Sequence, residues 1–390
     1  MANVTVNASA NIQAVNRCVV RTSSNRVYVF VTSGTSILAK KGNQDGEPSS
    51  FSTIASLTGI TNLQDVGVAA AIDSSGIVHV IYYDAPNADM GTSGNLRHVT
   101  FNTSTDSFGT PAVAGTVESE FAYIPRISVA IDANNDVHAV WRDAGKVKGS
   151  AEYHNWYANN IGGTWNSRVL VSALSGDTDI CCDIIIADPL SSVNADRPII
   201  VENSVTNIFA YYGNALNATA FNSNNDITGS ITTSGSSLAS LAIDSNETLI
   251  VSFVEGTTFD LMIVEHNNSD NWATWQTPED VDTSVDYFLP SIAVNDTDKY
   301  IFVEESAADD INLWKDEGSG WSEETADADL PNSGTFNDVK AKYASKNNNS
   351  PTALDYVFED SSGNVLYNTI SVGATPRELY QGVVNPMAMI

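Results

Sequence analysis

Short apolar runs alternate along the chain with clusters of Asn, Ser, Thr, Asp and Gly. Such clusters are typical of tight turns, and the runs between them are rich in the β-branched and aromatic residues that strands favour. In residues 68–84, a run of small and branched side chains reaches a turn at Asp73, and a second run with Tyr and Val returns. The pattern predicts an all-β chain built from consecutive hairpins.

This hairpin repeats along the sequence, and a further strand follows it each time, as at residues 96–101 and 261–266. Four strands in about 50 residues is the period of a propeller blade. Copies of the hairpin occupy residues 68–84, 127–143, 240–255 and 290–304, and weaker copies end at Glu202 and Glu359. The sequence therefore predicts one β-propeller domain over residues 1–390, with about seven four-stranded blades and six or eight as alternatives. The expected blades begin near residues 12, 63, 123, 177, 236, 287 and 336.

A ring of blades must be closed by a terminal strand. Residues 3–7 have a strand-like pattern and would complete the last blade from the N-terminal side, and residues 378–384 would do so from the other end. The segments 1–10 and 375–390 are therefore both candidate closing segments, and the sequence does not choose between them.

Three segments, residues 158–165, 268–275 and 314–321, share a spacing of polar and Trp positions at the expected junction of the third and fourth strands, and the first and third also have the Gly position. They resemble the Asp-box, the Ser-x-Asp-x-Gly-x-Thr-Trp hairpin of sialidase-like propellers. In this motif an Asp caps turn amides, Gly takes a positive φ and Trp packs between blades. The matching residues are Asn160, Gly162, Thr164, Trp165, Asp270, Thr274, Trp275, Asp316, Gly318 and Trp321.

The resemblance implies the fold of the sialidase-like propellers but not their activity. Sialidases need three arginines that converge on a carboxylate, a Tyr nucleophile with a Glu partner, and an Asp acid/base. The chain has only nine arginines, and residues 123–126 carry the letters of the opening signature in the wrong order. Sialidase activity is not expected.

The charge balance excludes one class of partner. The chain has 47 acids against 18 bases, a net charge of −29, and its Lys and Arg residues are scattered singly. Because phosphate binding needs clustered cations, we expect no nucleic-acid partner and no binding to anionic membranes. No stretch approaches the ~20 apolar residues of a membrane span, and the first residues do not resemble a secretory signal.

Carboxylates follow or end the second strand of most repeats, at the face where propellers usually bind ligands. Six acids round one rim could hold Ca²⁺ or act as acid and base on a glycan, whereas the simpler interpretation is that each caps a turn. Aromatic side chains near the same rim would suit neutral sugars, or they belong to the core. The candidate ligand-binding residues are Asp84, Asp143, Trp141, Tyr83, Glu202, Glu255, Glu304 and Tyr287.

A second candidate site follows from the histidine that recurs in the second strands, at His79 and His138. Such a residue is more often a packing residue than a ligand. Seven-bladed polysaccharide lyases use His and Tyr near the axis, so His138 with Tyr123 and Arg142 is the fallback catalytic set.

No complete catalytic set is present, and the composition resembles that of phage tail, fibre and capsid-decoration proteins. The leading prediction is a non-enzymatic binding or structural module of a virion or other extracellular surface, with glycans or other surface proteins as partners. A near-regular ring of similar acids would argue against chemistry, which needs two unlike environments. The alternative is a carbohydrate-active enzyme, a glycoside hydrolase or polysaccharide lyase, with its site on the acidic rim.

Overall fold

The computed structural model describes the strands and most of their turns. The described residues are 3–8, 18–60, 68–84, 94–117, 127–143, 152–175, 181–187, 196–204, 206–222, 225–233, 239–266, 274–295, 297–305, 310–323, 338–342, 353–359 and 364–371. Within these ranges there is no helix that is long and apolar enough to cross a membrane.

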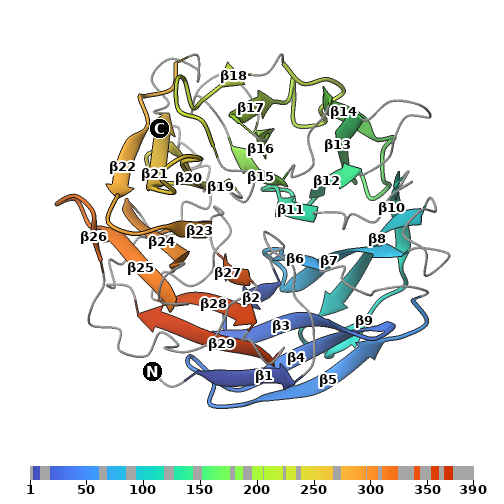
Figure 1. Ribbon diagram of the computed structural model, residues 1–390. Helices are drawn as coiled ribbons and strands as arrows, with labels where there is room; N and C mark the ends of the chain where they lie inside the picture. The colour runs from blue at the N-terminus through green and yellow to red at the C-terminus, as the bar shows by residue number, and fades with distance from the viewer. Residues whose placement is uncertain are drawn as a thin grey trace, which may run out of the picture.

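The strands form seven antiparallel sheets arranged in a ring, with successive sheets following the chain round the disc (Figure 1). Each sheet keeps its strands in sequence order from the axis outward, apart from the last sheet, which takes its outermost strand from the N-terminus. The predicted all-β propeller of four-stranded blades is confirmed, and the number of blades is seven.

The inner half of each blade consists of two strands, and their bounds are given in order from blade one to blade seven. The innermost strands are β2 (Val19–Arg21), β6 (Ala69–Ile72), β11 (Ile127–Ile131), β15 (Cys181–Ala187), β19 (Ser240–Ile243), β23 (Tyr287–Asn295) and β27 (Asp338–Lys342). The second strands are β3 (Arg26–Ser33), β7 (Ile77–Asp84), β12 (Val137–Asp143), β16 (Arg197–Asn203), β20 (Leu249–Val254), β24 (Asp298–Glu305) and β28 (Ala353–Glu359).

The outer half of each blade follows the same order. The third strands are β4 (Ser36–Asp45), β8 (Gly94–Asn102), β13 (Glu152–Asn159), β17 (Ile208–Tyr212), β21 (Leu261–His266), β25 (Asp310–Asp316) and β29 (Asn364–Ser371). The outermost strands are β5 (Phe51–Leu57), β10 (Ala112–Val117), β14 (Val169–Ser175), β18 (Asn225–Asp226), β22 (Glu279–Asp282), β26 (Ser322–Glu323) and β1 (Val4–Ala8), and the short β9 (Ser107–Phe108) also pairs with β8.

The repeated Asp fixes the turn between the first and second strands. One carboxylate oxygen of Asp73 accepts the N–H groups of Ser75 and Ile77 at 2.9 and 2.8 Å. Asp132 and Asp244 bind the N–H groups two and four residues later in the same way. The third residue after each Asp has a positive φ, which is the conformation that lets the chain reverse in so few residues.

These turns define the two faces of the disc. In a four-stranded antiparallel blade the 1–2 and 3–4 connections lie at one edge, which we call the turn face, and it carries the turns at residues 73–76, 132–135 and 244–247. The 2–3 connections and the links between blades lie at the other edge, which we call the rim face. At the rim face the second strands end at Ser33, Asp84, Asp143, Asn203, Val254, Glu305 and Glu359.

The N-terminal strand closes the ring. Strand β1 pairs with β29 as the outermost strand of blade seven, and in Figure 1 the blue β1 lies beside the red β29. Residues 375–390, the other candidate closing segment, lie outside the described residues. Because the first strand completes the last blade, blade seven joins both ends of the domain.

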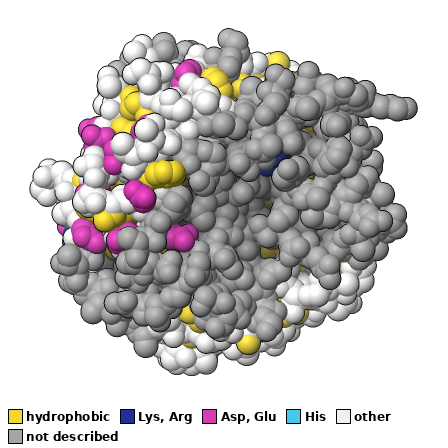
Figure 2. All heavy atoms as spheres, in the orientation of Figure 1, with side chains coloured by type: hydrophobic (Ala, Val, Ile, Leu, Met, Phe, Trp, Pro, Cys, Tyr) yellow, Lys and Arg dark blue, Asp and Glu magenta, His cyan; other side chains and the backbone are white. Residues whose placement is uncertain are grey.

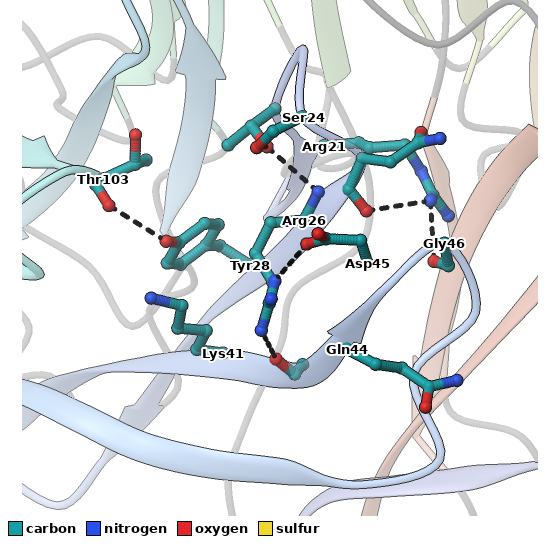
Figure 3. Close-up of polar contacts among 12 residues, drawn as sticks. Arg21, Ser24, Arg26, Tyr28, Lys41, Gln44, Asp45, Gly46 and Thr103 are labelled. Carbon is teal, nitrogen blue, oxygen red and sulfur yellow. Dashed lines mark hydrogen bonds and ion pairs between the residues drawn. The ribbon is translucent and has the colours of Figure 1, made fainter.

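A buried ion pair reinforces this closure. Arg21 of blade one donates to Asp355 of blade seven through Nε at 2.8 Å and through Nη2, and the Tyr367 hydroxyl donates to Asp355 at 2.6 Å. The Arg21 and Asp355 side chains are 1 % and 0 % exposed. Arg21 also donates to the carbonyl of Gly46 at 2.7 Å, and Figure 3 shows it beside the more exposed Arg26–Asp45 pair.

The hydrophobic core lies between the blades. Each cluster of buried side chains joins neighbouring sheets: one joins Ala69 and Leu96 of blade two to Ile127 and Trp141 of blade three. Comparable clusters join blades three and four, four and five, five and six, and six and seven. Since each blade is covered only by its neighbours, the described core is a ring of blade–blade contacts.

Two of the motif tryptophans bind the preceding blade. The Trp165 indole N–H donates to His98 of blade two at 3.3 Å, and the Trp275 indole N–H donates to Tyr212 of blade four at 2.9 Å. His98 and Tyr212 both lie on the third strand of their blade. The two tryptophans are partly buried, so each one packs between blades while keeping part of its ring at the surface.

The turn chemistry of the three motif copies differs. The Asp316 carboxylate accepts the N–H groups of Gly318 and Gly320 at 2.9 and 3.0 Å, and both glycines have positive φ. In the first copy Asn160 binds the N–H of Val137 instead, and the neighbouring Asn159 binds its own turn. Asp270 lies outside the described residues. The Asp-box assignment of these segments stays a prediction.

Replacing Trp165 by Ala should lower the free energy of unfolding by about 2–3 kcal/mol, less than for a fully buried Trp, because the ring is only partly buried. Trp165→Phe keeps the ring contact but leaves His98 without the indole donor, at a cost of about 1 kcal/mol. Denaturant midpoints measure both values. A change below about 0.5 kcal/mol for Trp165→Ala would show that this contact does not hold blades two and three together.

Candidate functional site

The rim face carries the acids that the sequence singles out, and the structure gives them different surroundings. Figure 2 views the disc in the same orientation as Figure 1 and shows several described acidic side chains over blades five and six, while much of the visible surface belongs to residues outside the described ranges. The burial and the hydrogen-bond partners of each rim acid are therefore described separately below.

Glu202 is the described rim acid with the least solvent contact. It lies on β16 between Cys182 of β15 and Phe209 of β17, and its side chain is 0 % exposed. Its carboxylate accepts a hydrogen bond from the hydroxyl of Ser172, on the outermost strand of blade three. The side-chain amide of Asn155 donates to the same hydroxyl at 3.4 Å. A polar contact thus connects blades three and four within an otherwise apolar interface.

The strand register explains how blade three presents this polar surface. Arg142, Asn155 and Ser172 are direct partners across β12, β13 and β14, so they form one row on one side of the sheet. Val140 and Tyr157, two residues along from Arg142 and Asn155, pack against blade four, and alternation places the row on that side as well. All three members of the row are buried.

Tyr211 completes the group on the blade-four side. Burial raises the pKa of the Tyr211 phenol, the negative charge of Glu202 raises it further, and a hydrogen bond with Ser172 acts in the opposite direction. The phenol therefore stays protonated at neutral pH. We call Arg142, Asn155, Ser172, Glu202 and Tyr211 the Glu202 cluster.

The other described rim acids are bound in simpler ways. Asp84 is partly exposed and accepts from Arg97 at 3.1 Å. Glu255 caps its own turn: burial acts to raise its pKa, but hydrogen bonds from Thr258 and Thr257 outweigh it and hold the pKa below the usual value. Glu304 is partly buried on β24. The backbones of Asp143 and Glu359 are described but their side chains are not.

The expected ring of equivalent acids is therefore not what the structure shows. One rim acid is fully buried against a hydroxyl, one is ion-paired near the surface, and one caps a turn. The expectation that symmetry gives every acid the same surroundings is wrong, because the outer strands of each blade differ in sequence and supply different partners.

The aromatic candidates belong to the inter-blade core. Trp141 is 0 % exposed and lies against Gly115, where a Cβ atom would come within 2.8 Å of its ring. Tyr83 is 4 % exposed and covers Gly94 in the same way. Tyr287 is 1 % exposed, donates to Asp282 at 2.8 Å and contacts the edge of Trp314. None of these three rings offers a face to a sugar in this structure.

The fallback set is not assembled among the described residues. His138 lies at the turn-face end of β12, between Asp132 at 3.5 Å and the Tyr157 hydroxyl at 2.7 Å. Arg142 lies four residues further along the same strand, which separates the two Cα atoms by about 13 Å. Tyr123 lies outside the described residues. His138 thus acts as a buried link in the core, and Arg142 belongs to the Glu202 cluster.

Asn155, Ser172 and Tyr211 were missed by reasoning from the sequence. The sequence position of Asn155 could have indicated its burial. It lies two residues from Tyr157 in a strand whose alternate positions face a neighbouring blade, so a polar residue there is buried.

The Ca²⁺ alternative has no described donor set, because the residues that the structure describes include no group of three or more His, Cys, Asp or Glu side chains able to hold a metal ion.

Comparison with known proteins gives similarity at the level of structure. No family model matches the chain, and no curated protein sequence matches it. An α-L-arabinanase of Penicillium chrysogenum complexed with arabinobiose superposes with a TM-score of 0.53 at 8 % identity, over 95 % of this chain and 98 % of that one. A polysaccharide lyase superposes at 0.49 and 11 % identity, over 93 % and 91 % of the two chains.

A sialidase of Streptococcus pneumoniae is also similar, with a TM-score of 0.42 and 12 % identity over 94 % of this chain and 70 % of that one. The solved structures that resemble this chain over most of its length include several enzymes that act on carbohydrates. The prediction of a non-enzymatic virion module is wrong in the light of this finding, and its alternative is better supported. At these identities the likeness shows the fold alone, and the chain is a seven-bladed β-propeller.

Proposed function

We propose that the chain is a carbohydrate-active enzyme that cleaves a glycan at the rim face, where blades three and four meet. The observation that carries this proposal is the burial of Glu202 against the Ser172 hydroxyl, in contrast to rim acids that are ion-paired or cap turns. The α-L-arabinanase likeness supports a glycan as the substrate class.

Hydrolysis of a glycosidic bond by two carboxyl groups needs them in different protonation states. One must be neutral to protonate the leaving oxygen, and the other must be ionised. Glu202 is assigned as one of the two carboxyl groups, and it reaches a glycan only when its contact with Ser172 opens, because its side chain is 0 % exposed. Asp143 follows Arg142 at the end of β12 and is the adjacent rim acid, so it is assigned as the second carboxyl group.

The acidic surface limits the substrate. With a net charge of −29 and acids at the rim, uronate and sialate chains are repelled, and a neutral polysaccharide is the expected substrate. In this assignment Arg142 and Asn155 orient the substrate or the acid through hydrogen bonds.

The test is release of reducing ends from a panel of neutral polysaccharides, with polygalacturonate as a separate substrate whose unsaturated elimination product is recorded by ultraviolet absorbance. We expect reducing ends from at least one neutral glycan, and a fall of at least about a hundredfold in kcat for Glu202→Gln, because a general acid or base contributes that much or more. Gln has the shape of Glu and still accepts a hydrogen bond from Ser172, so the fold is retained.

Glu255→Gln is the matched control, since Glu255 is a rim acid that binds its own turn, and its activity should stay within about threefold of the unmodified protein. Full activity in Glu202→Gln would remove Glu202 from the mechanism. Absence of sugar release from every glycan would contradict the proposal. An unsaturated product would replace hydrolysis by elimination.

A further inference from the structure

A second polar and aromatic surface lies at the outer edge of the disc, away from the Glu202 cluster. A groove of about 600 Å³ runs between residues 225–231, at the edge of blade four, and residues 274–278, at the edge of blade five. The first wall contains strand β18 and the second directly precedes strand β22, and Figure 1 shows these as outermost strands of successive blades. The volume is in the range of small-molecule sites.

Trp275 forms part of one wall, and its orientation is fixed before any ligand arrives. Its indole N–H donates to the Tyr212 hydroxyl at 2.9 Å, and the ring meets His266 edge to face with centroids 5.1 Å apart. Since the ring is held from behind and only partly buried, it offers part of its surface to the groove. A ligand therefore does not have to immobilise it.

The opposite wall is also ordered by hydrogen bonds. One oxygen of Asp226 accepts the N–H and the hydroxyl of Thr228 at 2.9 and 2.7 Å, and the other accepts from the Asn207 amide at 2.7 Å. The backbone N–H of Gln276 donates to the backbone carbonyl of Glu265 at 2.9 Å, which fixes the wall that carries Trp275. The Gln276 side chain is exposed in the groove.

The side chains of the groove select a class of ligand. They supply an aromatic ring, amides, hydroxyls and a single carboxylate, and none of the residues that line it is Lys, Arg or His. A lone carboxylate disfavours anionic ligands, whereas an aromatic ring beside amides and hydroxyls suits the C–H face and the hydroxyl groups of a sugar.

We propose that this groove is a glycan-binding site for neutral polysaccharide chains, separate from the Glu202 cluster. It holds the chain against Trp275, with Gln276 and Asp226 as hydrogen-bonding partners of sugar hydroxyls. The site does not depend on the proposed enzymatic function, because binding at the groove needs no turnover.

The test is native gel electrophoresis through gels that contain arabinan, arabinoxylan, galactomannan or dextran, with polygalacturonate as the anionic probe. The unmodified protein should be retarded by at least one neutral polysaccharide and not by polygalacturonate. Ser230→Trp places an indole in the groove and should abolish retardation. Gln276→Ala removes one hydrogen-bonding group and should raise the Kd by about threefold to tenfold.

Ser52→Trp is the control, because it makes the same change at an exposed serine on the outermost strand of blade one, and it should be retarded like the unmodified protein. An unchanged unfolding midpoint in each variant shows that the fold is intact. Loss of sugar release in Glu202→Gln and loss of retardation in Ser230→Trp are separate outcomes, so failure of this proposal and failure of the enzymatic function can be told apart. No retardation in any neutral gel, or equal retardation with Ser230→Trp, would overturn the proposal.

Discussion

Asp355→Ala should lower the free energy of unfolding by about 3–5 kcal/mol, because it leaves the Arg21 guanidinium charged, buried and without its carboxylate. Tyr367 loses its hydrogen-bond acceptor at the same time. The three groups connect blade one to blade seven, so the loss weakens the contact that closes the ring. Denaturant unfolding curves give the value directly.

Two comparisons separate charge from position. Arg26→Ala breaks an ion pair in the same blade whose side chains are 26 % and 58 % exposed, and it should cost about 1 kcal/mol or less. Arg21→Met combined with Asp355→Leu should recover much of the loss, since an apolar pair has no desolvation penalty. If Asp355→Ala were no worse than Arg26→Ala, the buried pair would have no special part in closing the ring.

Stability should also fall as the pH is lowered from about 6.5 toward 3. Burial, and then the proximity of His79, lower the pKa of His98 to about 3, whereas a histidine in the unfolded chain has a pKa of about 6.5. Within this window the unfolded chain binds the proton more readily, so acid favours unfolding. The full difference corresponds to between about 3 and 5 kcal/mol, all of it present above pH 6.5.

The hydrogen bonds around His98 give a geometric reason for its neutrality. The Trp165 indole can only donate, so His98 accepts at Nδ1, carries its proton on Nε2 and donates to His79 at 3.0 Å. The other His79 nitrogen faces Asp73 at 3.4 Å. A second proton on His98 would point at the indole N–H, so protonation breaks the contact between blades two and three.

The variant His98→Gln tests this pH dependence. Gln does not titrate, yet its amide can still donate to His79. The free energy of unfolding of the unmodified protein should therefore fall more steeply than that of the variant between pH 6 and 4, by about 1.4 kcal/mol per pH unit. Parallel pH profiles would show that His98 takes up its proton equally well in the folded and unfolded states.

The fold could be predicted from the sequence because each blade repeats its own local chemistry. The Asp73, Asp132 and Asp244 turns bind the same two backbone N–H groups, and a motif of that kind is visible in a single chain. The choice of closing strand was not predictable. Residues 3–7 and 378–384 both have strand patterns, and pairing with β29 depends on contacts across the whole length of the chain.

The candidate site was harder to predict for a physical reason. The acids at the ends of second strands were visible, but their surroundings come from the third and fourth strands of the neighbouring blade, which vary from blade to blade. Glu202 differs from Glu255 because Ser172 and Asn155 lie opposite it, and nothing in the local sequence of Glu202 records this. The burial of Trp141 and Tyr83 depends in the same way on the glycines that they cover.

The closure by β1 has a consequence for the order of folding. During synthesis the first strand leaves the ribosome before any blade, and its partner β29 follows more than three hundred residues later. Until then β1 is not paired in blade seven. The Arg21 guanidinium cannot yet bind the Asp355 carboxylate, which lies 334 residues later in the sequence. Contacts so distant in sequence form slowly. Completion of blade seven is therefore also the folding step that closes the ring. A chain that lacks its first eight residues retains an open sheet edge at β29.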